Sequence, residues 1–280
     1  MVEPISAAAA VVYGTKKFSD GLQRLLGPSA DEVAEALRRL TASRLRKVGR
    51  VIENANKKTI GDAEAAGAIP SRVALRVLDE ATYSDDELIV EYLGGVLASS
   101  RTPAGRDDRG NTLTLLVARL STYSLRSHYI FYAEFCRCLH KKTLNVYDAN
   151  DLNVQAKMFV PYRTYQAAME FSQDEHPDAI GTSCLYGLKQ EGLLSFVRGG
   201  AREYLQVQYP NIPEAGVIVE PTVAGVELFL WALGFGQAQA REFLRLEPQE
   251  TRIAAVPWAP GALLISDIEE SSATEGEPLS

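Results

Sequence analysis

The sequence predicts a mainly α-helical protein, in which a helical bundle is followed by a winged-helix-like part with a small β-hairpin. Apolar residues recur at helical spacing through most of the first 145 residues. Short runs of β-branched and aromatic residues lie on both sides of Gly199-Gly200 and indicate a hairpin. Helical patterns precede and follow this hairpin, which is the order of the wing region in winged-helix modules. We therefore expect a helical domain over 1–145, a winged-helix-like domain over 150–247 and a peripheral segment over 248–280.

The first domain begins with one or two helices that end at Gly27-Pro28. A long amphipathic helix is expected from about Ala30 to Lys58, because Ser29 and Glu32 form a capping box before it. Its exposed surface is basic. The residues that make it so are Arg38, Arg39, Arg46, Arg50 and Lys57.

The next stretch carries the strongest capping and packing signals of the chain. Gly94-Gly95 lies inside a helical pattern, where each glycine costs about 1 kcal/mol relative to alanine, so a close helix contact is expected there. The predicted helices are Ser71–Ala81, a helix capped by Ser84 and Glu87, Leu113–Leu120 and the aromatic Leu125–Lys142.

The second domain mixes helices with short strands. The run Val154–Tyr162 is compatible with a strand or with the start of a helix. The remaining expected helices are Tyr162–Phe171, Pro177–Glu191 and Val223–Leu233, and the expected strands are Leu193–Arg198, Tyr204–Gln208 and Gly216–Thr222.

Composition indicates a soluble globular protein. Hydrophobic residues make up 46% of the 280 residues, and the net charge of -7 argues against a surface that binds nucleic acid throughout. Residues 1–60 are locally basic, with eleven Lys and Arg against six Asp and Glu, whereas the tail from Asp267 is acidic and expected to be disordered. The three cysteines do not form a disulfide framework. Glu3 lies where a signal peptide would carry a basic residue, and no apolar window is long enough to predict a membrane span. A cytoplasmic location is expected.

Several short motifs resemble the abortive-infection alpha family. They are the LLGPSADE run at Leu25–Glu32, Ile69-Pro70 with LDEA at Leu78–Ala81, DDEL at Asp85–Leu88, VLASS at Val96–Ser100, Tyr186-Gly187-Leu188 with Gly192-Leu193-Leu194, and Pro221-Thr222 with Gly225. The chain departs from the family at Tyr92–Leu97, where the family often has a Trp and a Leu-Leu pair, and over 101–145. The resemblance implies a mostly helical prokaryotic protein of antiphage defence. It supplies no catalytic residues.

A charged loop is the sharpest polar cluster, and we consider it a candidate contact loop. Its residues are Arg101, Arg106, Asp107, Asp108 and Arg109. The adjacent carboxylates have the chemistry of a divalent-cation site, and the arginines that of a phosphate site. The alternative is a solvated loop whose charges pair locally or cap the following helix.

No complete catalytic or metal-binding set is visible. Cys136 and His140 share a helix face, but Cys138 points away from it, so a metal site is disfavoured. Ser183 lies in Gly181–Leu185, which lacks the final glycine of a nucleophile elbow. We therefore predict no catalytic residues, no cofactor and no metal.

Nucleic-acid binding would use the helix Asp178–Glu191, whose only cation is Lys189, and a wing that carries Arg198 and Arg202. The leading hypothesis is a non-enzymatic protein of antiphage defence that acts through a protein partner or self-association. One alternative is a winged-helix nucleic-acid-binding regulator. The other is an effector whose basic helix over 29–58 binds an anionic membrane surface.

Overall fold

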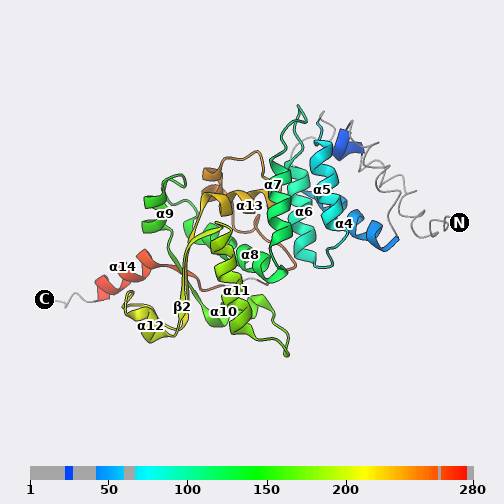
Figure 1. Ribbon diagram of the computed structural model, residues 1–280. Coiled ribbons are helices and arrows are strands. Elements are labelled where there is room, and N and C mark those ends of the chain that lie inside the picture. The colour runs from blue at the N-terminus through cyan, green and yellow to red at the C-terminus, as the bar shows by residue number, and fades with distance from the viewer. Residues whose placement is uncertain (1–22, 28–41, 60–66, 258–259, 276–280) are drawn as a thin grey trace. The chain divides into compact units, whose positions relative to one another are not determined.

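The computed structural model describes residues 23–27, 42–59, 67–257 and 260–275 (Figure 1). The first expected helix, except for its last turn, and the capping box at Ser29 and Glu32 lie outside these residues. The chain forms two compact units. Unit 1 contains the described residues of 1–122 with Leu230–Ala238, and unit 2 contains Tyr123–Phe229 with the described residues of 239–280. The change of unit therefore falls at the start of the aromatic helix, whereas the expected boundary lay after it.

Unit 1 is a helical bundle built around α6. Its helices are α4 (Ala42–Lys58), α5 (Ser71–Ala81), α6 (Glu87–Ser99) and α7 (Arg109–Arg119), which lie side by side in Figure 1. The three other helices all pack against α6, and every residue of α6 from Tyr92 to Ser99 is buried. A helix that is apolar on all sides is suited to this central position.

The apolar stripe of α4 is part of the same core. Leu45, Val48 and Val51 are buried, and α4 packs along α6. Its basic residues are also largely engaged. Ion pairs join Lys47 to Asp85, Arg50 to Glu87, Lys57 to Glu53 and Lys58 to Glu91.

The start of α6 differs from the predicted capping box. The N-cap is Asp86, whose carboxylate accepts the Leu88 N–H at 2.8 Å. Ser84 is not the cap, because its hydroxyl donates to the Glu80 carbonyl at 3.2 Å in the turn that ends α5. The preceding helix α5 begins at Ser71, as predicted, and its N-cap is Pro70.

The diglycine in α6 makes the close contact that its sequence predicts. A Cβ on Gly95 would lie 1.9 Å from the backbone oxygen of Ala232, in the last turn of α13 (Val223–Leu233). A Cβ on Gly94 would lie 2.8 Å from the Asn54 side chain. Two backbones therefore meet at Gly95 with no room for a side chain.

Unit 2 combines helices with one antiparallel sheet. Its elements are α8 (Thr122–Leu139), α9 (Ala149–Gln155), β1 (Met158–Pro161), α10 (Tyr162–Met169), α11 (Pro177–Gln190), β2 (Leu194–Gly200), α12 (Arg202–Gln206), β3 (Gly216–Pro221), most of α13, the 3-10 helix η2 (Ala240–Arg245), β4 (Leu263–Leu264) and α14 (Ile265–Glu275).

The order of these elements is that of a winged helix. A strand, two helices and a hairpin follow one another, and the sheet has the order β2-β3-β1-β4 with antiparallel neighbours. The first strand thus pairs with the last strand of the hairpin, Phe159 opposite Ile218. The mainly helical fold with a small β element is confirmed.

One expectation for unit 2 is wrong. Tyr204–Gln208 forms the helix α12 and its following turn, not a strand, because Leu205 and Tyr209 must both reach the apolar cluster around Phe159. A strand would instead place Leu205 and Val207 on one face, yet Val207 is 80% exposed. In the C-terminal segment, β4 pairs with β1 at the edge of the sheet and α14 follows it.

The aromatic helix α8 forms the core of unit 2, and its tyrosine hydroxyls hold loop backbone. The Tyr132 hydroxyl donates to the Leu193 carbonyl at 2.5 Å and accepts the Thr222 N–H at 3.0 Å. The Tyr129 hydroxyl holds the Thr251 carbonyl and the Ile253 N–H in the same way, at 3.0 Å and 2.7 Å. These bonds connect α8 to both ends of the hairpin and to the segment after η2.

Replacing Tyr132 by phenylalanine is expected to lower the free energy of unfolding by about 2 kcal/mol, because it leaves two backbone groups without their partner. Urea unfolding measures the change. Tyr83→Phe is the matched control, since Tyr83 is 62% exposed and its hydroxyl should matter by less than about 0.5 kcal/mol. Equal losses in the two variants would show that the Tyr132 hydroxyl holds nothing.

Candidate functional site: recognition helix, wing and pocket

Helix α11 occupies the recognition-helix position of the winged-helix unit. Pro177 supplies its first residue and Gly192, with φ of 71°, ends it. Gly181, Cys184, Leu185 and Leu188 face inward. The polar or aromatic residues that face solvent are Asp178, Thr182, Ser183, Tyr186, Lys189 and Gln190. This face is polar and aromatic, with a single cation.

The wing, formed by β2, β3 and the segment between them, carries the two arginines that the sequence indicates. Arg198 lies over the Tyr204 ring, 4.6 Å from its centroid, and donates to the Gln208 side chain. Arg202 begins α12 and is exposed, and no described residue forms an ion pair with it. Only Arg202 thus extends from the wing without a described partner.

The net negative charge of this region does not favour binding to the phosphates of a nucleic acid. Residues 149–222 contain nine Asp and Glu against five Lys and Arg. Binding to a nucleic acid relies on cations that neutralise phosphates, and their shortage weakens it regardless of sequence.

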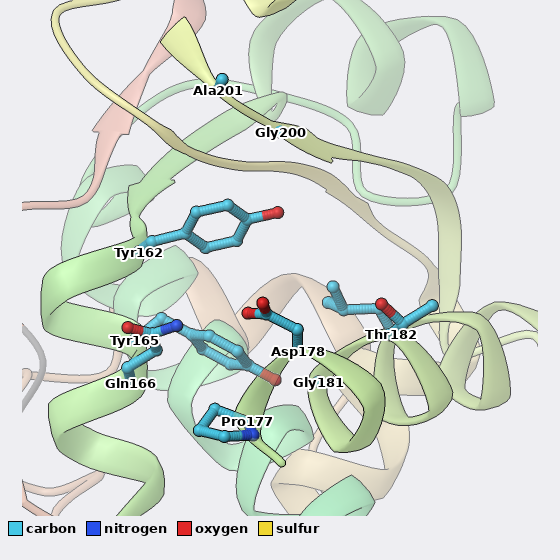
Figure 2. A pocket seen from close by; sticks show the side chains of 10 residues that line it. Tyr162, Tyr165, Gln166, Pro177, Asp178, Gly181, Thr182, Gly200 and Ala201 are labelled. Atoms are coloured by element: carbon cyan, nitrogen blue, oxygen red, sulfur yellow. The ribbon is translucent and has the colours of Figure 1, made fainter.

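A pocket lies between α10, α11 and the start of the wing (Figure 2). Its volume is about 250 Å³. Its lining residues are Tyr162, Tyr165, Gln166, Pro177, Asp178, Gly181, Thr182, Leu185, Gly200 and Ala201. The three segments meet here because β1 leads directly into α10 and the hairpin folds back over both helices.

Tyr162 and Asp178 give the pocket its chemistry. In Figure 2 the Tyr162 ring extends across the pocket beneath Gly200, and the Asp178 carboxylate is turned toward it. Partial burial raises the pKa of Tyr162, and the Asp178 charge raises it further. Gly199 makes room for the phenol, since a Cβ there would lie 2.4 Å from its oxygen. Sequence reasoning missed this pocket, because its walls are far apart in the chain and no motif joins them.

The charged loop of unit 1 is organised by pairing between its own residues and neighbouring helices. Arg109 donates to both oxygens of Asp107, with the closest contact at 2.6 Å, and its guanidinium lies over the Trp231 ring at 5.1 Å. Arg109 and Gln237 both lower the pKa of Asp107, Arg109 the more strongly. Asp108 precedes α7 and pairs with Arg72 at 3.6 Å, but its side chain does not cap the helix.

The two other arginines of this loop differ in their surroundings. The Nε of Arg101 donates to the Arg24 carbonyl at 3.2 Å, and a Cβ on Gly67 would lie 2.9 Å from the Arg101 guanidinium carbon. Arg106 is exposed, and none of the described residues bonds to its side chain. The loop therefore presents Arg106 to solvent, while both neighbouring carboxylates have arginine partners.

The other groups with possible chemistry are the candidate metal ligands, His128 and Ser183. Within the described residues, no group of three His, Cys, Asp or Glu side chains is placed to hold a metal ion. His128 is fully buried, where its Nε2 donates to the Gly225 carbonyl at 3.2 Å, and burial lowers its pKa to about 3. Ser183 lies on the exposed face of α11, and no described side chain is bonded to it as a base.

All three cysteines are free. Cys136 is buried and Cys138 is half-buried, and desolvation raises the pKa of Cys136 to about 12 and that of Cys138 to about 11. The thiolate is the reactive form, and Cys184 is also buried. We expect iodoacetamide at pH 8 to leave the native protein unmodified over a period in which the denatured chain takes up three adducts, as measured by intact mass. Rapid labelling of the native protein would contradict this burial.

None of the helices in the described part of the chain combines the length and apolarity that crossing a membrane requires. Comparison of the chain with family models, with curated proteins and with solved structures gives no match.

Proposed function

We propose that this protein binds another protein through the face formed by α11 and the wing, without catalysing a reaction, as part of antiphage defence in the cytoplasm. The observation that carries the proposal concerns the charge of α11. This helix has the position of the recognition helix in a winged helix, but it lacks the positive charge that binding to nucleic acid requires. Its solvent face has Lys189 alone against Asp178, and the region around it is acidic.

The side chains on this face are those that protein interfaces use. Tyr186 is 58% exposed on α11, and Tyr204 is 54% exposed on the wing beside Arg198. Tyrosine and arginine are enriched among the residues that contribute most to protein–protein affinity. Val207, on the same wing, adds an exposed apolar side chain. A partner protein would cover all three.

The antiphage setting comes from the resemblance to the abortive-infection alpha family. Three of its motifs fall on the described bundle of unit 1, where Leu78–Ala81 ends α5, Asp85–Leu88 begins α6 and Val96–Ser100 ends α6. Three free thiols are in keeping with a reducing compartment.

The test is a phage challenge of a susceptible host that expresses the protein. We expect reduced plating of at least one phage in a panel. The double variant Tyr186→Ser with Tyr204→Ser should lose this protection and remain folded, because both side chains are more than half exposed. Tyr83→Ser is the control, since Tyr83 is 62% exposed on unit 1. Unchanged plating with the native protein would remove the antiphage setting, and protection by the double variant would remove the proposed face.

The winged-helix strand order favours nucleic-acid binding as a second candidate function, in which Arg198 and Arg202 would contact phosphates. A gel shift at low salt with micromolar protein decides between the two. We expect free DNA to remain unshifted, because acidic residues outnumber basic ones across 149–222. Retarded DNA whose retention is lost in Arg198→Ala and Arg202→Ala would favour the regulator.

A further inference from the structure

The pocket of unit 2 carries an anionic group without a counter-charge. Asp178 lies in its wall, and the residues that line it include no Lys or Arg. Within the described part of the chain, Asp178 forms no ion pair. The nearest arginine along the wing, Arg202, follows the lining residue Ala201 but is exposed and outside the lining.

The position of Asp178 in the first turn of α11 does not explain why its carboxylate points into the pocket. A carboxylate in the first turn of a helix is favoured by the helix dipole. The helix dipole would stabilise a carboxylate equally well if the side chain extended into solvent away from the pocket. In Figure 2 the carboxylate, which is also accessible to solvent, points across the cavity to the Tyr162 ring, with Thr182 beside it. A carboxylate and an aromatic ring thus border one small space.

This pair of walls suits an organic cation. A guanidinium or ammonium group gains a charge-assisted hydrogen bond from a carboxylate and cation–π attraction from an aromatic ring. An anion would be repelled, and an apolar group would remove water from Asp178 without replacing its hydrogen bonds. The volume, about 250 Å³, is just below the range of about 300–1,000 Å³ for drug-sized ligands. It fits a single long side chain.

We propose that this pocket receives the guanidinium or ammonium group of an arginine or lysine side chain on the partner protein, held by Asp178 and packed on Tyr162. The source of that side chain rests on the proposed function, since it requires a protein partner. The chemistry of the pocket does not, and can be tested on the full chain alone.

The probes are Nα-acetylarginine N-methylamide and its lysine equivalent, followed by amide chemical shifts in the full-length protein. We expect weak binding, with a Kd on the order of millimolar for a single side chain, and shifts at Gly181, Thr182, Gly200 and Ala201. The citrulline derivative has the same shape without the charge. It should bind about tenfold more weakly or not at all.

Asp178→Asn keeps the size of the side chain and should weaken arginine binding by about tenfold or more. Asp174→Asn makes the same charge change at an exposed residue outside the pocket and should leave binding unchanged. Thr182→Met fills the cavity from α11 and should also abolish binding, which keeps the test valid if Asp178→Asn alters the helix. Thermal unfolding of each variant confirms that it is folded.

Equal binding of the arginine and citrulline derivatives, or equal losses in Asp178→Asn and Asp174→Asn, would overturn the proposal. Tight binding of spermidine with no binding of either amino-acid derivative would show that the pocket binds a free polyamine. It would contradict the proposal that a side chain of a partner protein occupies the pocket. Failure of the proposed function is a separate result, because loss of phage protection is measured with the Tyr186 and Tyr204 variants and does not use these probes.

Discussion

Gly95→Ala is expected to lower the free energy of unfolding by about 3 kcal/mol, at the upper end of the usual cost of overpacking a core. The added methyl would lie 1.9 Å from the Ala232 backbone oxygen, so one of two helix backbones must move. That oxygen also accepts a hydrogen bond from Lys58 Nζ at 2.9 Å, which the movement would break. The gain in helix propensity, about 1 kcal/mol, does not offset this. Urea unfolding measures the difference.

Gly181→Ala is the matched control, because Gly181 is also a buried glycine in a helix. A Cβ there has its nearest neighbour, a Tyr165 ring carbon, at 3.8 Å, which is an ordinary contact. This variant should be neutral or more stable by up to about 1 kcal/mol. If Gly95→Ala were equally harmless, the approach of α6 to the last turn of α13 would be looser than the structure has it.

Glu91→Gln is expected to cost about 2 kcal/mol at pH 7, because it leaves a largely buried ammonium without its counter-charge. Lys58 Nζ lies 2.6 Å from a Glu91 carboxylate oxygen and also donates to the Glu91 and Ala232 carbonyls at 2.8 and 2.9 Å. Glu53→Gln is the control. Its exposed ion pair with Lys57 should contribute less than about 0.5 kcal/mol. Equal losses in the two variants would mean that the buried pair contributes nothing.

The pH dependence of this variant follows from the Lys58 pKa. Burial lowers that pKa below its ordinary 10.5, and the Glu91 charge partly restores it. Between the folded pKa and 10.5 the unfolded chain binds more protons, so stability rises with pH there. Without Glu91 the folded pKa falls further and the window widens. The deficit of Glu91→Gln relative to the native protein should therefore shrink as pH rises from about 7 to about 10.

The fold could be predicted where a pattern is long or a local rule is strict. Helical periodicity located α7 and α8 to within a few residues, and the helix Val223–Leu233 was predicted with the bounds it has. The diglycine indicated a close contact, although nothing local could name Ala232 as its partner. The prediction failed at Tyr204–Gln208, where alternation indicates a strand and tertiary packing of Leu205 decides for a helix.

The candidate site was less accessible to sequence reasoning. The charged loop was predicted as a contact loop because four charged residues, Arg106, Asp107, Asp108 and Arg109, are adjacent. The partners of its two carboxylates could not be predicted, since they depend on how α5 and α7 pack. The pocket differs from the loop because no motif in the sequence marks it. Tyr162, Asp178 and Gly200 are each unremarkable in sequence, and only the folding of the hairpin over two helices places them together.

The pairing of β1 with β4 has a consequence for how the chain folds during synthesis. Phe159 pairs with Ile218 and with Leu263, so the sheet of unit 2 cannot be completed before Leu263 leaves the ribosome. Unit 1 is similarly delayed, because its bundle includes Leu230–Ala238 in addition to its first 122 residues. Contacts of such high sequence separation slow folding and leave apolar surface exposed meanwhile. The nascent chain should therefore remain a substrate for chaperones until the residues of β4 have been synthesised.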